Sequence, residues 1–251
     1  MVRPLLVFDL DGTLSLIRHG WQDVMADVMS EALSVSLPRA SGLRAVARRV
    51  VSDTNGSPVV LQMQVLSERA VAAGGAAIDA PARARDYQAR MAAARGARRA
   101  STSPRALLVP GAAGFVAKAR AAGFACAVVS GSSADDVASD LAFLGLSGMF
   151  GDLVRSPADP AVASGFSKER AFRDLMAACA AQSLVAFGDG PGEIRAALAV
   201  GGVGVGIAHI PGSAAADPAL SVALARAGAS FVAADFLDPR CWAAAAGVLA
   251  G

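Results

Sequence analysis

Short apolar runs alternate with longer amphipathic stretches over most of the chain. The first run, Leu5 to Phe8, is too short for a helix and lies between Pro4 and Gly12, so it predicts a buried parallel strand. From Pro110 onward we expect strands over residues 124–130, 150–154, 184–188 and 203–207, and helices over residues 111–122, 133–144, 168–181 and 191–200. This alternation predicts an α/β fold, a Rossmann-like parallel sheet with helices on both faces.

A long insertion after the first strand has helical periodicity instead. Apolar residues of its first helix recur at helical spacing: Trp21, Val24, Met25, Val28, Met29, Ala32 and Leu33. Further helices are expected over about 43–51, 59–73 and 82–95, with breaks at 55–58 and 74–75. The pattern predicts a small helical domain over residues 16–105, inserted into a core that consists of residues 1–15 and 106–251.

Composition and charge narrow the classes of protein. The 251 residues are enough for a core with an insertion, and the formal net charge of +2 gives no strong field for nucleic acid. We find no apolar span of about 18 to 20 residues for a bilayer and no secretory signal. The widely spaced Cys126, Cys179 and Cys241 lack metal-ligand spacing and indicate buried free thiols in a reducing compartment. We therefore expect a cytoplasmic protein without nucleic-acid or membrane partners.

The glycine-rich stretch over residues 201–206 invites comparison with a dinucleotide-binding loop. Such a loop follows a strand and opens a helix. Here the glycines surround two valines that have the pattern of the strand itself. We therefore interpret the stretch as a turn and a closely packed strand rather than a cofactor site.

Two aspartates, Asp9 and Asp11, follow the first strand and precede the turn at Gly12 and Thr13. In open α/β sheets, ligands bind at the carboxyl ends of the strands. Two carboxylates at that place can hold a divalent cation and still divide the work of nucleophile and general acid/base. A strand followed by an ordinary Asp-Gly turn is the alternative that this motif alone leaves open.

Three further segments continue the pattern. The second strand ends at Ser130 and Gly131, Lys168 is one of two lysines in the chain, and a later strand ends in a turn with Asp189 and Glu193. In this order the segments resemble the four motifs of the haloacid dehalogenase-like (HAD) hydrolase superfamily. The resemblance covers most of the chain and points to phosphoglycolate phosphatase-like members, in which a helical insertion at this place is a type C1 cap.

The resemblance implies roles for the acidic residues. Asp9 would attack phosphorus to give an aspartyl-phosphate, and Asp11 would protonate the leaving oxygen and then activate water. Mg²⁺ would be held by the Asp9 side chain, the Asp11 backbone carbonyl and Asp189. Glu193 is expected to be an indirect or water-mediated partner of the metal, because many relatives carry aspartate at this position and glutamate is one methylene longer; direct ligation stays open.

The resemblance also implies a phosphate-binding set. Ser130 and the Gly131 amide would bind phosphate oxygens, Lys168 would offset charge on the nucleophile and the phosphoryl group, and Gly12 and Thr13 would shape the loop. Further candidate substrate-binding residues lie in the insertion: Arg18, His19, Asn55 and Gln62. Ordinary placement at a hinge or on the surface is the alternative for each of these four.

The expected function is Mg²⁺-dependent hydrolysis of a small soluble phosphomonoester, with a sugar phosphate favoured by the family analogy. Asp11 argues against a dehalogenase, and the absence of lysine from the insertion argues against a phosphonatase. Two alternatives stay open: a phosphosugar mutase of the β-phosphoglucomutase type and an inert HAD-like binding domain. The apolar face of the insertion could also serve a homodimer.

Overall fold

The computed structural model describes residues 3–55, 57–157 and 165–247. The chain divides into two compact units. The first, called the sheet unit here, takes the described parts of Met1–Ile17, Thr102–Pro157 and Phe166–Gly251. The second, called the helical unit, takes those of Arg18–Ser101 and Ala158–Gly165.

The sheet unit contains a six-stranded, all-parallel sheet with the order β3-β2-β1-β4-β5-β6. Its strands are β1 (Leu5–Phe8), β2 (Ala125–Val129), β3 (Val154–Arg155), β4 (Leu184–Gly188), β5 (Val203–Ile207) and β6 (Val232–Ala233). Because β1 pairs with β2 on one side and β4 on the other, all four of its residues are buried. The predicted α/β class is confirmed.

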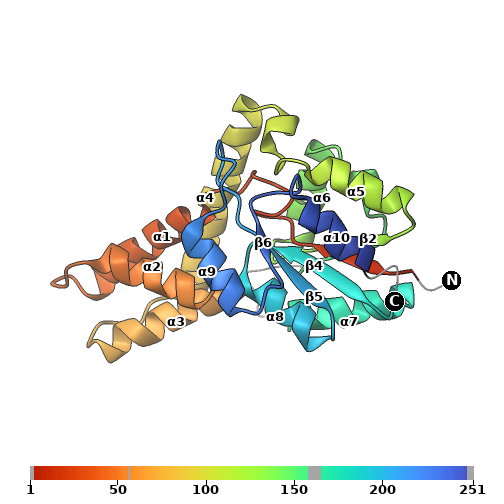
Figure 1. The fold of residues 1–251 in the computed structure, drawn as a ribbon. Coiled ribbons are helices and arrows are strands. Elements are labelled where there is room, and N and C mark those ends of the chain that lie inside the picture. Colours follow the sequence, from red (N-terminus) through yellow and green to blue (C-terminus); the bar gives the residue numbers. More distant parts are fainter. Residues whose placement is uncertain (1–2, 56, 158–164, 248–251) are drawn as a thin grey trace. The chain divides into compact units, whose positions relative to one another are not determined.

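Helices cover both faces of this sheet, as predicted (Figure 1). The helices of the sheet unit are α5 (Ala112–Ala121), α6 (Ala134–Phe143), α7 (Lys168–Cys179), α8 (Pro191–Ala199), α9 (Pro218–Arg226), α10 (Pro239–Gly247) and the 3₁₀ turns η1 (Pro104–Leu107) and η2 (Ser147–Met149). Leu6 and Phe8 share a core cluster with α5, α6 and α10, whereas Leu5 and Val7 share one with α7 and α8. This alternation follows from the two-residue period of a strand.

A cluster of aromatic rings holds the carboxyl ends of β1 and β4 together. The rings of Phe8 and Phe187 stack with centroids 5.3 Å apart, and Phe115 and Phe236 pack against both. Aromatic pairs of this kind contribute about 0.5 to 1.5 kcal/mol each beyond their buried area. Since Phe8 directly precedes Asp9, this packing fixes the position of the Asp9 backbone, from which the carboxylate extends.

Two predictions of secondary structure need correction. The strand expected over residues 150–154 is β3 at Val154–Arg155, because Phe150 follows the 3₁₀ turn η2 and Gly151 has a φ of 52°. Phe150 is apolar because it is buried in the core, not because it lies in a strand. The elements α9, β6 and α10 are additional to the prediction, which places none after residue 207.

The glycines of β5 confirm the packing interpretation of residues 201–206. A Cβ atom at Gly204 would lie 3.0 Å from the Ile194 side chain of α8. At Gly206 it would lie 2.9 Å from Leu224 of α9. Both distances are shorter than ordinary contact, so these glycines allow helices to approach the strand closely.

The helical unit contains α1 (Trp21–Ser36), α2 (Leu43–Asp53), α3 (Val59–Ala72) and α4 (Ala80–Ser101). Its core includes Met25, Met29, Val50 and Met63, at the apolar positions that predict the helices. The fourth helix is longer than the expected 82–95, because it continues past the apolar positions to a last turn that contains the half-buried Arg98 and Arg99. In the described parts of both units, no helix is long and apolar enough to span a membrane.

Candidate active site

Asp9 and Asp189 lie at the same edge of the sheet because their strands are parallel neighbours. Asp9 is the first residue after β1, and Asp189 is the first after β4. The Asp9 amide donates to the Phe187 carbonyl at 2.9 Å, so the pairing of the two strands continues up to the carboxylate. The topology thereby brings together two acidic residues that are far apart in the sequence.

The loop after β1 requires a glycine at position 12. Gly12 has a φ of 80°, and its amide donates to the Ser15 carbonyl at 2.8 Å. A Cβ atom there would overlap the Asp189 carboxylate, with only 2.6 Å to its Cγ. The neighbouring Thr13 is fully buried, and its hydroxyl has no hydrogen-bond partner among the described residues. Gly12 therefore allows both the turn and the close approach of Asp189.

Lys168 lies between two carboxylates. It is the first residue of α7, whose N-cap Ser167 accepts a hydrogen bond from the Arg170 amide at 3.2 Å. The Lys168 Nζ donates to Asp9 Oδ1 at 2.6 Å and also forms an ion pair with Glu193 Oε1. Because only 13% of the Lys168 side chain is exposed, this charge acts mainly within the site.

Glu193 is held by the glycine-rich turn that precedes it. A Cβ atom at Gly188 would lie 2.6 Å from the Glu193 Cβ and Cγ, so only glycine leaves room for this side chain. Glu193 is 4% exposed and belongs to the first turn of α8. Its Oε1 pairs with Lys168, while its Oε2 has no hydrogen-bond partner in the described chain.

The turn after β2 brings hydroxyl groups to the same edge. Ser130 is 1% exposed, and its amide donates to the Arg155 carbonyl of β3 at 3.0 Å. Its Oγ accepts from the Ser132 amide at 3.1 Å, and the Ser132 hydroxyl donates to Asp11 Oδ2 at 2.8 Å. Gly131 between them is exposed, and its missing side chain would face open space.

Ser132 is a site residue that the sequence patterns do not indicate. Its place in the turn, three residues after the end of β2, is the one signal in the sequence, because serine side chains commonly bond to nearby backbone in such turns. Nothing local indicates its partner, which lies 121 positions away in the chain.

The acidic residues influence each other's protonation. Burial raises the pKa of Asp9, with Lys168 acting in the opposite direction. Burial, together with the charges of Asp9 and Asp11, raises the pKa of Asp189 well above its usual range, again opposed by Lys168. Lys168 alone does not balance the negative charge of these aspartates. A cation bound at this edge of the sheet would reduce the excess negative charge.

The predicted metal donors consist of two side chains, those of Asp9 and Asp189, with a backbone carbonyl of Asp11. Among the described residues, no group of three or more histidine, cysteine, aspartate or glutamate side chains is arranged to hold a metal ion. Glu193 is also predicted as a metal partner, and in the structure its Oε1 pairs with Lys168. A carboxylate pair supplemented by a carbonyl and water is chemistry that suits Mg²⁺.

The four predicted substrate-binding residues of the insertion belong to the helical unit. Arg18 is buried, His19 is exposed and Asn55 is half-buried. Gln62 is 3% exposed; its Nε2 donates to the Ser57 carbonyl at 2.9 Å, and its Oε1 accepts from Thr54 Oγ1 at 3.2 Å. These contacts tie the start of α3 to the preceding loop and favour a structural role for Gln62.

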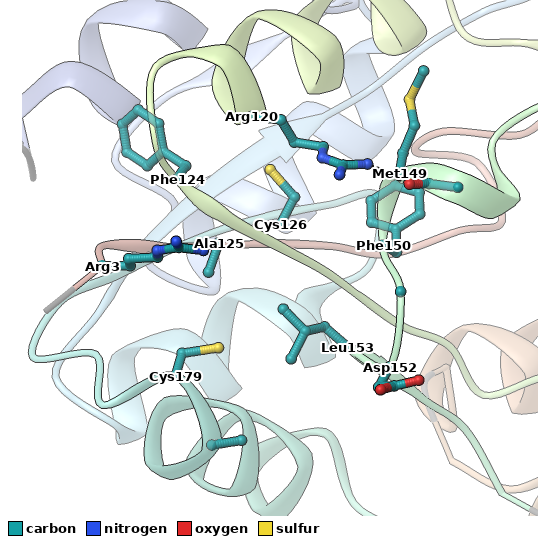
Figure 2. A pocket seen from close by; sticks show the side chains of 13 residues that line it. Arg3, Arg120, Phe124, Ala125, Cys126, Met149, Phe150, Asp152, Leu153 and Cys179 are labelled. Carbon is teal, nitrogen blue, oxygen red and sulfur yellow. Dashed lines mark hydrogen bonds between the residues drawn. The ribbon is translucent and has the colours of Figure 1, made fainter. Parts of the chain in front are cut away.

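A pocket of about 710 Å³, whose lining residues are drawn in Figure 2, lies at the amino ends of the first three strands. Arg3, Phe124 and Leu153 line it, and each lies just before the amino end of one of β1, β2 and β3. Cys126 and Cys179 also line it, and burial raises the pKa of Cys126 to about 12. The pocket is therefore separate from the carboxylates at the other end of the strands.

All three cysteines are free. Cys126 and Cys241 are buried as expected, but Cys179 is half-buried at the end of α7, which corrects the prediction for that thiol.

No curated protein sequence matches the chain.

The fold is similar to those of many solved structures. A HAD family hydrolase from Deinococcus radiodurans R1, solved with bound phosphate and sodium, has a TM-score of 0.57 at 21% identity over 97% of this chain and 96% of its own. A predicted phosphoglycolate phosphatase from Haemophilus somnus 129PT has a TM-score of 0.60 at 19% identity over 95% and 97%. A haloacid dehalogenase-like family protein from Streptococcus pneumoniae has 0.62 at 14% identity over 96% and 98%.

The family model described as haloacid dehalogenase-like hydrolase matches residues 4–201, a range that includes all four motifs. The resemblance predicted from those motifs is confirmed, and so is the prediction of an enzyme. The chain belongs to the haloacid dehalogenase-like hydrolases.

Proposed function

We propose that this hydrolase is an Mg²⁺-dependent phosphatase that cleaves a small phosphomonoester through an aspartyl-phosphate on Asp9. The observation that carries the proposal is the hydrogen bond of 2.6 Å from Lys168 to Asp9, beside Asp11 and Asp189. A carboxylate can approach an anionic phosphoryl group only where positive charge offsets both. Lys168 supplies part of that charge at the nucleophile itself.

In the first step, Asp9 attacks phosphorus and the bond from phosphorus to the ester oxygen breaks. Asp11 gives a proton to the departing oxygen, which leaves as an alcohol. In the second step, Asp11 takes a proton from water as the water oxygen attacks the aspartyl-phosphate. The bond from phosphorus to the Asp9 oxygen breaks, inorganic phosphate leaves, and both aspartates return to their starting forms.

The other residues bind and orient the phosphoryl group. The Ser130 hydroxyl and the Gly131 amide are proposed donors to its oxygens, and Lys168 compensates its charge. Ser130 already accepts a hydrogen bond from the Ser132 amide, so its own hydrogen is left to donate elsewhere. Gly12 and Thr13 set the loop that carries Asp11.

Mg²⁺ fits the donors present. The Asp9 and Asp189 side chains and the Asp11 carbonyl would hold it, with Glu193 as a nearby partner through Oε2. The raised pKa values of Asp9 and Asp189 and the buried, unpartnered Glu193 Oε2 support a cation here. When bound, Mg²⁺ supplies charge that shields the phosphoryl oxygens from the attacking carboxylate.

We propose that residues 1–15 and 106–251 form the catalytic core and that residues 16–105 are a C1 cap that selects the substrate. A small phosphate ester, with a sugar phosphate preferred, is the proposed substrate class. The support is the family membership and the likeness to the predicted phosphoglycolate phosphatase of Haemophilus somnus. Arg18, His19 and Asn55 are the proposed cap residues for recognition.

We also propose a cytoplasmic enzyme that acts on a soluble small molecule. Three free thiols, two of them buried, support a reducing compartment. We also propose a homodimer that uses the helical unit, on which Val35 and Val71 are exposed. Sedimentation of the purified protein would test the oligomeric state.

The test of function is phosphate release from a panel of sugar phosphates, phosphoglycolate and nucleotides, with Mg²⁺ and with EDTA. Asp9→Asn is the inactive variant, and Asp174→Asn on the exposed face of α7 is the matched control. Release that needs metal and disappears only in Asp9→Asn supports the proposal. Isomerisation of a sugar phosphate without net release would replace it with a mutase, and no turnover of any kind would favour a binding domain.

A further inference from the structure

Ser132 joins two of the motifs through one side chain and one amide. Its hydroxyl donates to Asp11 Oδ2 at 2.8 Å, and its amide donates to Ser130 Oγ at 3.1 Å. The residue thus contacts the proposed acid/base on one side and a proposed phosphate ligand on the other. Its side chain is partly buried, so the hydrogen bond to Asp11 is only partly exposed to competition from water.

The surrounding backbone fixes the position of this hydroxyl. On the amino side, the Ser130 amide is bound to the Arg155 carbonyl of β3 at 3.0 Å. On the carboxyl side, Ser133 is the N-cap of α6 and its Oγ accepts from the Asp136 amide at 3.2 Å. Ser132 is held between a strand end and a helix start, both of which belong to the packed core of the sheet unit.

We propose that Ser132 is a positioning residue that holds the Asp11 carboxylate in the orientation needed for proton transfer to the leaving oxygen. The inference rests on the proposed phosphatase mechanism and assigns to it a residue outside the four motifs. A hydroxyl suits this place because it can donate to Asp11 Oδ2 both when the carboxyl group is ionised and when Oδ1 carries the proton for the leaving oxygen. The same partner can therefore hold Asp11 in both of the forms that the two steps require.

A positioning role predicts a specific kinetic signature. Proton transfer matters most for esters with poor leaving groups, such as alkyl phosphates, and little for p-nitrophenyl phosphate, whose leaving group departs without a proton. The value of kcat/KM covers the steps up to departure of the alcohol. Loss of Asp11 orientation should therefore steepen the dependence of kcat/KM on the leaving group.

The experiment measures kcat/KM for a series of aryl and alkyl phosphates with wild type, Ser132→Ala and Ser132→Thr. Ser132→Ala is expected to lose about 10- to 100-fold on alkyl phosphates, part of the roughly 10²- to 10⁴-fold that acid/base catalysis contributes, and less than about threefold on p-nitrophenyl phosphate. Ser132→Thr keeps the hydroxyl and should restore most of the loss. Asp11→Asn gives the dependence of kcat/KM on the leaving group that is expected when proton transfer from Asp11 is absent.

Ser133→Ala is the matched control, because it removes a neighbouring hydroxyl that caps α6 and does not bond to Asp11. It should lower the melting temperature and leave the leaving-group dependence unchanged. Equal loss on every ester in Ser132→Ala, or a wild-type slope, overturns the inference while the phosphatase stands. If wild type has no metal-dependent activity that Asp9→Asn abolishes, the proposed function fails first and the inference fails with it.

Discussion

Lys168 Nζ donates a hydrogen bond of 2.6 Å to Asp9 Oδ1, although the two residues are 159 positions apart in the chain. The same ammonium group forms an ion pair with Glu193. A buried cation between two buried carboxylates couples the stability of this edge of the sheet to its proposed chemistry. Removal of the charge of Lys168, Asp9 or Glu193 should therefore affect both the stability of the fold and the proposed activity.

Lys168→Met should leave Asp9 and Glu193 buried without their cation. Breaking such a pair from one side costs about 3 to 5 kcal/mol of folding stability. Phosphatase activity should fall at least about 10²-fold, the usual effect of losing one electrostatic donor. Urea unfolding at neutral pH and initial rates with saturating Mg²⁺ measure the two effects.

The other lysine offers the control. Lys118 is exposed, with its Nζ 3.7 Å from the centre of the Trp242 ring, so Lys118→Met should cost about 0.5 to 1 kcal/mol and leave activity unchanged. Similar losses of activity in both variants would contradict the assignment of Lys168 to the site.

The contribution of Asp9 and Asp189 to the stability of the metal-free protein should fall as pH rises above about 3.8, the ordinary pKa of aspartate. The pKa values of Asp9 and Asp189 are raised in the folded state, so the folded protein holds protons that the unfolded chain releases. The loss of stability continues until the pH exceeds the pKa values of the folded state. A tenfold difference in proton affinity between the folded and the unfolded state corresponds to about 1.4 kcal/mol in the free energy of unfolding. Urea unfolding in EDTA between pH 4 and pH 8 measures this slope.

Asp189→Asn should flatten that slope and raise the melting temperature in EDTA, because it removes one of the crowded charges. Added Mg²⁺ should stabilise wild type more than this variant, since a ligand stabilises only the state that binds it. If Asp189→Asn is less stable than wild type in EDTA, the negative charge of the carboxylates does not exceed the positive charge at the site. Asp174→Asn serves as the exposed control.

Gly12→Ala should abolish most activity. The added Cβ would meet the Asp189 carboxylate in a turn with a φ of 80°. Gly42 has a similar φ of 67° at the start of α2, with open space around the missing Cβ. Gly42→Ala should therefore show the backbone strain alone, about 1 to 2 kcal/mol, with full activity. Full activity in Gly12→Ala would disprove the close approach of Asp189.

Glu193→Gln should lower kcat without a large change in the Mg²⁺ concentration needed for half-maximal rate. The reason is that Glu193 Oε1 pairs with Lys168, whereas Asp189 has no ion pair among the described residues and is a proposed metal ligand. Asp189→Asn should show the reverse pattern, with a strongly increased Mg²⁺ requirement. If Glu193→Gln shifts the Mg²⁺ requirement as far as Asp189→Asn does, Glu193 is a direct ligand.

The amino-acid sequence by itself determined the alternation of elements, the class of the fold and the family. These properties depend on local information: apolar run length separates strands from helices, and short motifs mark the strand ends. The buried run Leu5–Phe8 and the glycines of β5 are examples in which the residue types alone indicate the packing. Local patterns were insufficient for β3 and β6, each of which has two residues.

Tertiary structure alone decided which side chains meet. The strand order β3-β2-β1-β4-β5-β6 places the ends of β1, β2 and β4 side by side, and no periodicity encodes that order. It pairs Lys168 with both Asp9 and Glu193, and Ser132 with Asp11, across 121 residues in the latter case. Hydrogen bonds and ion pairs act over a few ångströms in space, so the partner of each polar group is settled only when the core packs and the strands come together.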